Sequence, residues 1–518
     1  MNTSKKEIEF TGDSGAATAT EIPRPIVCRN DYSSITVPAI GDWTPTLSVS
    51  ILIPAHGHQD KLDLTLAALA AQTYPVGLTE VIVVDDNTDP PLRLPDIRPD
   101  NTTLVRPSPN GWGSANAINT AAARADGTVL MRLDSDMVCY HHHVESQLRY
   151  HHQLDYASVL GHKLFVDFDP AQHTPQHVHT TVTKRQTHTL YSGQVHEKQW
   201  TERVIDSTDQ LRSADHTEAY RVFVGATGSV HRALFDAADG MDTVPLGGDS
   251  IFGYRLSQAG AVFIPDNDSS SWHLGRSQMQ SRRDAGIRYR TPFVANRVPE
   301  FAPRRSAPGQ LWEVPLAEVV VDVAGSSVNE AEGSVTALLR GTTPDIRVHL
   351  VADWPDPHER HATLDDPRAD LRLIRETYRG DPRVRFDSAP PERDAAVPFR
   401  LTLPASARPK PQAIETLVTV ANGHQVGLVS ADLPEGGTVR LERHSAYARA
   451  RHLDPGHPDA LIDAVAGTHR VEASRVARRS GGAGPATPLR PGKSTLTRRV
   501  ARRLLPTSVR RRLRRLVS

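Results

Sequence analysis

The sequence is poor in cysteine, in aromatic residues and in long apolar runs. Only two of its 518 residues are cysteines, Cys28 and Cys139, which excludes a framework of disulfides and is typical of a reducing compartment. No segment approaches the roughly 20 consecutive apolar residues that a transmembrane helix requires. The first 22 residues are polar and lack the apolar centre of a secretion signal, so we expect a disordered leader there. A cytoplasmic chain of this length is expected to fold as two or three domains.

The chain also lacks a net charge, with 60 basic and 60 acidic residues, but the charges are unevenly distributed. From Arg490 onward there are 11 lysines and arginines and no acid, which leaves 49 basic against 60 acidic residues before that point. Apolar residues recur at helical spacing in this tail, at Val500, Leu504, Leu513 and Leu516. A basic amphipathic segment favours binding to an anionic membrane surface. We expect no nucleic-acid partner, because the tail has no aromatic residue to stack on a base; a merely solvated tail is the other alternative.

Apolar, β-rich runs alternate with helical patterns in the first part of the chain. Strand-like runs cover residues 48–54, 80–86 and 128–136. Between them, apolar residues have helical spacing from Asp60 onward and over residues 113–124. This alternation predicts a parallel sheet wrapped by helices, and ligands of such sheets bind beyond the carboxyl ends of the strands.

Acidic residues stand where these predicted strands end. Asp85 and Asp86 end the second run, and Asp134 and Asp136 end the third. Strand alternation would send Asp134 and Asp136 to the same side. Carboxylate oxygens suit a hard divalent cation, which can in turn hold a diphosphate. Most Asp-x-Asp pairs are solvated turn residues, but their convergence with Pro54 at the end of the first run favours a binding site.

Several short motifs occur in the order and at the spacing of a known enzyme family. They are Ile-Leu-Ile-Pro-Ala at 51–55, Gln-Thr-Tyr-Pro at 72–75, Val-Val-Asp-Asp-Asn at 83–87, Leu-Asp-Ser-Asp at 133–136, Val-Gly-Ala-Thr-Gly-Ser-Val-His-Arg at 224–232, Gly-Asp at 248–249 and Ser-Trp-His at 271–273. Over residues 46–280 the chain thereby resembles the inverting family-2-type glycosyltransferases of the GT-A fold. The resemblance implies an α/β domain with a Rossmann-like mixed sheet, which transfers a hexosyl group from a nucleotide sugar.

The resemblance also implies roles for individual residues. Asp136 is expected to bind Mg2+ or Mn2+ that bridges the donor diphosphate, and Asp249 to be the base that takes the proton of the acceptor hydroxyl. His273 is expected as a further metal ligand, since a neutral imidazole suits Mn2+. The residues expected to bind the nucleotide sugar are Pro54, Ala55, Asp85, Asp86 and Asp134.

Two of these roles have plain structural alternatives. Asp249 could act only as a helix cap. Gly248 stands where many relatives have glutamate, and Asp242 is another candidate base. His273 follows a predicted strand over 261–264 and a polar loop, and it could be a core histidine.

The segment between the Asp-x-Asp motif and residue 223 is rich in histidine. His173 and His177 have the spacing of one helical turn, which raises the idea of a zinc site. No acid or cysteine completes a ligand set at metal-site spacing, so a solvated loop is favoured. From its position, the segment 169–216 is expected to form part of the acceptor pocket.

The second half of the chain is expected to repeat the first in weakened form. Residues 317–323 and 346–353 are strand-like, and the second of these runs ends in an acid, as the run 80–86 does. We therefore predict a degenerate GT-A-like repeat without the metal motif; an unrelated α/β accessory domain is the alternative. The predicted parts are a partly disordered leader (1–45), the glycosyltransferase domain (46–300), the accessory domain (310–470) and a linker with the basic tail (480–518).

Together these features predict a metal-dependent glycosyltransferase of the cytoplasm, held at the inner face of the membrane by its tail. We expect a UDP-sugar as donor, and a cell-envelope glycan or a lipid-linked molecule as acceptor. A tailoring enzyme that glycosylates a small, soluble natural product is the alternative. Outside the enzymes, the alternative is a sugar- or lipid-binding scaffold, against which the intact Asp134, Asp136 and Asp249 argue.

Overall fold

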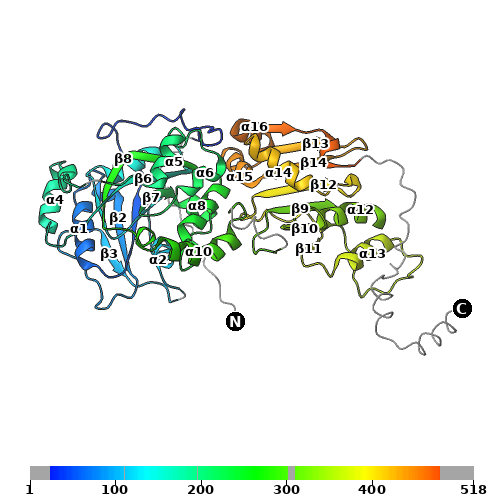
Figure 1. The fold of residues 1–518 in the computed structure, drawn as a ribbon, viewed down its shortest axis with the longest axis horizontal. Coiled ribbons are helices and arrows are strands. Elements are labelled where there is room, and N and C mark those ends of the chain that lie inside the picture. Colours follow the sequence, from blue (N-terminus) through cyan, green and yellow to red (C-terminus); the bar gives the residue numbers. More distant parts are fainter. Residues whose placement is uncertain (1–23, 110, 195, 302–309, 479–518) are drawn as a thin grey trace, which may run out of the picture. The chain divides into compact units, whose positions relative to one another are not determined.

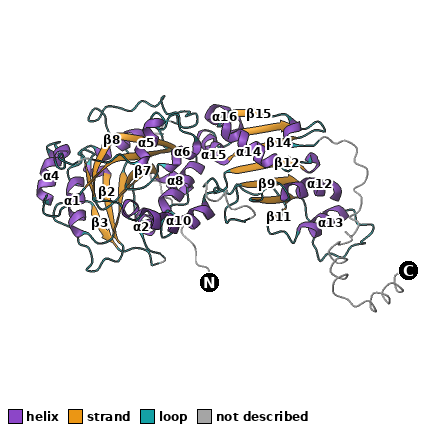
Figure 2. Ribbon diagram, in the orientation of Figure 1, coloured by secondary structure: helices purple, strands orange, loops and turns teal. Residues whose placement is uncertain are grey.

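The computed structural model describes residues 24–109, 111–194, 196–301 and 310–478. Two β-sheets organise this part of the chain, one of eight strands and one of seven (Figure 1, Figure 2). Both carry helices, so the predicted mixed α/β class with two domains is confirmed. The expected basic tail and most of the expected leader lie outside the described residues. Within the described residues, no helix combines the length and the apolar composition needed to cross a bilayer.

The first sheet has the strand order β3-β2-β1-β4-β7-β6-β8-β5. Its strands β3, β2, β1 and β4 are parallel, β7 is antiparallel to both of its neighbours, and β6 is parallel to β8. The strand bounds are β1 Val49–Ala55, β2 Thr79–Asp85, β3 Thr102–Val105, β4 Val129–Leu133, β5 Met137–Cys139, β6 Ala157–Val166, β7 Thr227–His231 and β8 Val262–Leu274.

Helices cover both faces of this sheet, which explains why its central strands are apolar on both sides. Ile51 and Ile53 of β1 pack in one core with residues of α1 and α3, whereas Leu52 packs in another with residues of α2 and α8. The helices of this part are α1 Gln59–Leu69, α2 Ser114–Ala122, α3 His143–His151, α4 Pro175–Thr183, α5 Trp200–Ser207, α6 His216–Arg221, α7 Arg232–Ala237, α8 Gly248–Gln258, α9 Gln278–Ser281 and α10 Arg283–Arg297, with the 3₁₀ turns η1 Val76–Leu78 and η2 Thr187–Thr189.

Two predicted elements of the first sheet differ from the observed ones. The run 128–136 does not remain a strand to its end, since β4 stops at Leu133 and Asp134 to Asp136 form the turn that leads into β5. The predicted short strand 261–264 is only the start of β8, which continues as far as Leu274. His273 therefore lies within a strand and not after a loop.

The second sheet repeats the strand order of the first. Its order is β11-β10-β9-β12-β14-β13-β15, which matches the first sheet strand for strand once the short edge strand β5 is set aside. The strand directions also match, because β14 is antiparallel to both neighbours and β13 is parallel to β15. The strands are β9 Ala317–Asp322, β10 Ile346–Val351, β11 Val384–Asp387, β12 Phe399–Pro404, β13 Leu428–Asp432, β14 Thr438–Arg443 and β15 Thr468–Arg470.

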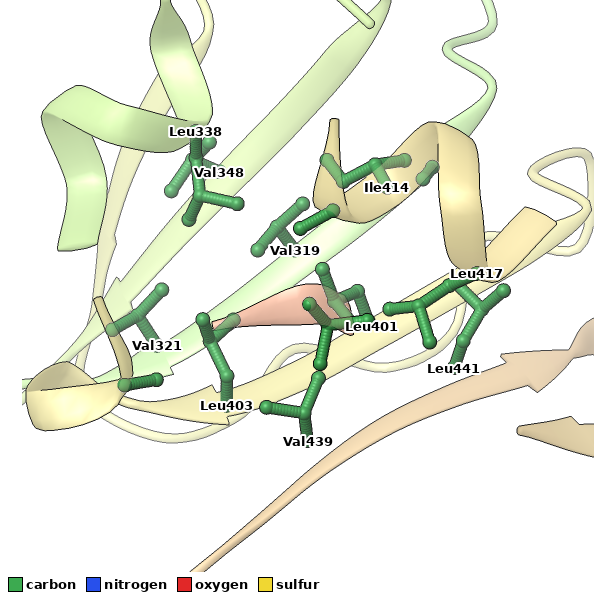
Figure 3. Close-up of a cluster of buried hydrophobic side chains, with 14 of the residues drawn as sticks. Val319, Val321, Leu338, Val348, Leu401, Leu403, Ile414, Leu417, Val439 and Leu441 are labelled. Carbon is green, nitrogen blue, oxygen red and sulfur yellow. The ribbon is translucent and has the colours of Figure 1, made fainter. Parts of the chain in front are cut away.

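One face of the second sheet is apolar and the other is charged. Figure 3 shows the apolar face, where Val319, Leu401 and Leu441 point toward Ile414 and Leu417 of α14. The opposite face carries a row of alternating charge across four strands, Arg347, Glu318, Arg400 and Glu442. The helices are α12 Val328–Leu339, α13 Ala369–Tyr378, α14 Ala413–Gly423, α15 His444–Leu453, α16 Pro458–Ala466 and α17 Ala473–Val476, with the 3₁₀ turn η3 Ala405–Ala407.

The shared strand order locates the difference between the two sheets. In the first sheet β4 is followed by Asp134 and Asp136, whereas its counterpart β12 ends at Pro404 and is followed by Ala-Ser-Ala. The second sheet thus has the topology of the first without the acids at this position, as the sequence predicted.

Candidate functional site

The predicted site residues other than Asp249, which lies on α8, lie along one edge of the first sheet. Because β1 and β2 are parallel with Ala55 opposite Asp85, the ends of both strands lie side by side. The turn with Asp134 and Asp136 follows β4, which is parallel to β1 and ends at the same edge. Met137 of β5 pairs with His273 of β8, and this pairing brings His273 next to Asp136.

The two acids after β2 have different surroundings. Both carboxylate oxygens of Asp85 accept bonds from backbone amides, Oδ1 from Thr88 at 2.9 Å and Oδ2 from Leu92 at 3.0 Å. Asp85 therefore fixes the loop that follows it. Asp86 accepts one bond, from the amide of Gly113 to Oδ2 at 2.7 Å, while its Oδ1 is buried without a partner among the described residues. This free oxygen can accept one further hydrogen bond.

Asp134, Asp136 and His273 form a group that could hold a metal ion. One potential ligand atom from each lies within 4.8 Å of the other two. The Nδ1 of His273 is 3.1 Å from the carbonyl oxygen of Gly275, and its Nε2 is 3.6 Å from Oδ1 of Asp136. A proton on Nδ1 would satisfy that carbonyl and leave the Nε2 lone pair directed at the group, which is the arrangement of a metal-binding histidine.

Burial and neighbouring charge act in opposite directions on Asp136. Burial raises the pKa of Asp136 above its ordinary value, and the charge of Asp134 adds to this effect, while His273 and Lys61 oppose it. The ammonium of Lys61 lies 3.5 Å from Oδ2 of Asp136 and donates to the carbonyl of Leu274. Lys61 was not predicted from the sequence, where it appears as an ordinary polar residue in the first turn of α1.

Asp249 is held by an arginine that was not predicted from the sequence either. Arg132 of β4 donates through Nη1 to Oδ1 of Asp249. It also donates through Nε and Nη2 to Oδ1 of Asp134, at 3.2 and 3.1 Å. Burial alone would lower the pKa of Arg132, but the charges of Asp249 and Asp134 raise it overall, so the guanidinium stays charged.

The observed contacts favour neither a capping role for Asp249 nor Asp242 as the base. The cap position of α8 belongs to Gly247, and no side-chain cap bond is formed there, so Asp249 does not act as the cap. Asp242 lies 3.1 Å from Arg255 and 2.6 Å from Arg297, which places its carboxylate in a structural ion-pair network.

A cavity lies beside β6. It is lined by Lys163 of β6, by Gly225 and by Gln199, Glu202 and Ile205 from the start and body of α5. Lys163 donates to the carbonyl of Gly225 at 3.4 Å. Burial lowers the pKa of Lys163, while the charges of Asp134 and Asp249 oppose this shift. The lining residues from α5 and its start fall in the segment 169–216 that was expected at the acceptor pocket.

The histidines of that segment have other contacts. His173 lies 2.8 Å from the carbonyl oxygen of Leu190 and stacks on His177, and no metal-ligand group other than the one at Asp136 was found among the described residues.

Part of the chain matches a known protein family. Residues 50–220 match the model of the family described as glycosyl transferase family 2. Over these residues, about a third of its length, the chain is similar to the family 2 glycosyltransferases. The resemblance predicted from the sequence is thereby confirmed for this segment, which contains the strands β1 to β4 and the acids that follow them.

Individual relatives cover smaller parts of the chain. A probable glycosyltransferase of Bacillus subtilis (strain 168), YdaM, is 32% identical over 96 residues, which are 17% of this chain and 22% of that protein. The mannosyltransferase PcManGT of Pyrobaculum calidifontis, solved with GDP-Man and Mn2+, aligns at 18% identity and a TM-score of 0.33, covering 52% of this chain and 66% of its own. S. aureus TarS 1–349, solved with UDP-GlcNAc, aligns at 14% identity and a TM-score of 0.33, covering 48% and 66%. The chain thus covers about a fifth of the length of the curated relative that it matches.

Proposed function

We propose that the chain is a metal-dependent, inverting glycosyltransferase that uses a UDP-sugar as donor. The observation that carries this proposal is the group of Asp134, Asp136 and His273, with ligand atoms within 4.8 Å of one another at the strand edge of a family 2 domain. Two carboxylates and an imidazole suit Mg2+ or Mn2+. Such a cation would neutralise the charge that develops on the leaving diphosphate.

The nucleoside is proposed to bind beside the ends of β1 and β2. The free, buried Oδ1 of Asp86 fits an N–H of the base or a ribose hydroxyl, and leaving such an atom unpaired costs about 1–3 kcal/mol. Pro54 and Ala55 are proposed to form the floor of this site, since Ala55 lies opposite Asp85. Asp85 is proposed to support the site through the loop that it fixes.

Asp249 is proposed to be the general base of the transfer. An inverting reaction needs one base, which removes the acceptor proton as the hydroxyl attacks the anomeric carbon. Asp249 lies in the first turn of α8 and is linked through Arg132 to Asp134, so the base and the donor site are joined by one side chain. The cavity at Lys163 and Gln199 is proposed to receive the acceptor.

The acceptor is proposed to be a cell-envelope glycan or a lipid-linked molecule. The support for this is the 11 basic residues from Arg490 onward, which would hold the enzyme at an anionic membrane.

The donor and the metal can be tested in one screen. UDP-, GDP- and dTDP-sugars are added to the full chain with and without Mn2+, and both the melting temperature and the release of nucleoside diphosphate are measured. A ligand that binds only the native state must raise its stability, so a UDP-sugar is expected to raise the melting temperature and to be turned over only with metal. Undiminished turnover in excess chelator would refute the metal dependence, and a preference for a GDP- or dTDP-sugar would refute the proposed donor.

A further inference from the structure

Arg132 contacts both halves of the proposed site. Its guanidinium donates to Oδ1 of Asp134, which directly follows the strand β4 that carries Arg132, and to Oδ1 of Asp249 on α8. Its side chain is only 11% exposed. Removing an arginine from water is costly unless its donors are used, and here they are used on two carboxylates that lie 115 positions apart in the sequence.

The backbone around Arg132 is shaped to admit the guanidinium. Gly225 has a φ of +76°, and a Cβ at this residue would lie 2.6 Å from Nη1 and 2.7 Å from Cζ of Arg132. The guanidinium therefore packs directly on the Cα of Gly225, at a position where glycine is favoured both by the backbone angle and by the lack of space. This packing fixes the plane of the guanidinium group, and therefore the direction of its hydrogen bonds to Asp134 and Asp249.

We propose that Arg132 is a positioning residue that holds the base Asp249 in register with the donor-binding Asp134. This inference rests on the proposed function. Because Arg132 engages Oδ1 of each carboxylate, and no bond to either Oδ2 is found among the described residues, the second oxygen of each stays available, one for the acceptor proton and one for the donor or its metal. A planar fork can bridge two acids in a fixed geometry, which a lysine ammonium cannot.

A double-mutant cycle on the full chain tests this role. The measured rate is the release of nucleoside diphosphate from the nucleotide sugar with Mn2+, where water or the acceptor supplies the attacking hydroxyl. Arg132→Met is expected to lower kcat by about 10- to 100-fold, the range for hydrogen-bond partners of metal ligands such as the proposed Asp134. Asp249→Asn is expected to lower kcat by about 10²- to 10⁴-fold. If Arg132 acts through Asp249, the double variant will be as slow as Asp249→Asn alone, within about threefold.

A glycine substitution separates placement from charge. Gly225→Ala keeps every charge but moves the guanidinium, so it is expected to lower kcat in the same direction as Arg132→Met. Gly325→Ala is the matched control, since Gly325 has a φ of +70° and a Cβ added there would meet nothing within 4 Å; it introduces the same backbone strain without a clash, and its kcat should equal that of the wild type. Arg132→Lys should recover charge but not geometry, and should stay well below the wild-type kcat.

The outcomes that overturn the inference differ from those that overturn the function. Three results would reject the positioning role while donor turnover by the wild type stands. They are a double variant whose loss in kcat is the product of the two single losses, a wild-type kcat for Arg132→Met, and a wild-type kcat for Arg132→Lys. If the wild type releases no nucleoside diphosphate with any donor, the proposed function is rejected and this inference with it. Melting temperatures of all variants are measured, and a cycle is built on Arg132→Gln if Arg132→Met does not fold.

Discussion

Replacing Asp136 by asparagine should separate metal binding from folding. The change keeps the shape of the side chain but removes the carboxylate that faces His273 at 3.6 Å. Because burial raises the pKa of Asp136 despite the opposing charges of His273 and Lys61, its charged form is unfavourable in the folded protein. Without metal, Asp136→Asn should therefore be at least as stable as the wild type at pH 7.

The wild type should gain stability from Mn2+ that the variant does not. A ligand at 100 times its Kd stabilises the native state by about 2.7 kcal/mol. In a unit of about 150–250 residues, each kcal/mol raises the melting temperature by about 2–4 °C, so a rise of about 5–10 °C is expected. The measurement is thermal unfolding with chelator and with increasing MnCl2.

The matched control is Asp353→Asn, which removes an exposed carboxylate after β10, in the sheet without the metal motif. It should keep the full response to Mn2+. An equal rise in Asp136→Asn and wild type would refute the assignment of Asp136 as a ligand, and a severe loss of stability in metal-free Asp136→Asn would show that the carboxylate is needed for folding.

Three further predictions concern the base, the tail and pH. Asp249→Asn should slow transfer by about 10²- to 10⁴-fold. Its control is Asp459→Asn, which should leave transfer unchanged, because Asp459 has the second position in α16 that Asp249 has in α8. NMR of the wild-type product should show an inverted anomeric centre. Deletion of residues 494–518 should abolish salt-sensitive flotation with anionic vesicles and spare transfer to a soluble acceptor; if the full chain does not bind such vesicles, the membrane proposal is wrong. Burial raises the pKa of Asp266 to about 6, so the folded state binds this proton more tightly than the unfolded state. The contribution of this group to the free energy of unfolding is therefore full below about pH 4 and is lost as the pH rises to about 6. This loss amounts to about 3 kcal/mol. Asp266→Asn should flatten the dependence of unfolding on pH in this window, and an unchanged profile in chemical denaturation would contradict the reasoning.

The strands and acids of the first sheet were predictable because each depends on a short stretch of sequence. β1, β2 and β4 are apolar runs buried on both faces, and they end at Ala55, Asp85 and Leu133. The convergence of the acids follows from the rule that parallel strands end at a common edge, so no long-range information was needed.

The length of β8 could not be predicted, because its middle reads as a polar loop. Ser269 and Ser271 are nevertheless buried in the strand. The hydroxyl of Ser269 donates to the carbonyl of His143 at 3.1 Å and that of Ser271 to the carbonyl of His162 at 3.0 Å. These partners are more than 100 positions away in the chain, so the bonds that make the serines compatible with a strand are not visible locally.

Arg132 was missed for a related reason. It lies in an apolar run two residues before Asp134, and in a strand that spacing places two side chains on one face. From this spacing alone, a contact between Arg132 and Asp134 could have been predicted. The second partner, Asp249, comes from another element, and nothing in the sequence near Arg132 indicates it.

The repeated sheet shows which features make the site. Both sheets have the same strand order, and both have an acid at the second position of the equivalent helix. Asp459 of α16 is exposed and accepts bonds from Arg440 at 2.6 Å and from the hydroxyl of Tyr447 at 2.8 Å. No acid directly follows β12 to complete a metal group. The valine- and leucine-rich interior of the second sheet maintains the same fold, whereas the proposed chemistry requires the turn after β4, the end of β8 and Arg132 together. Function in this chain is therefore assigned by the convergence of these side chains and not by the topology that the two sheets share.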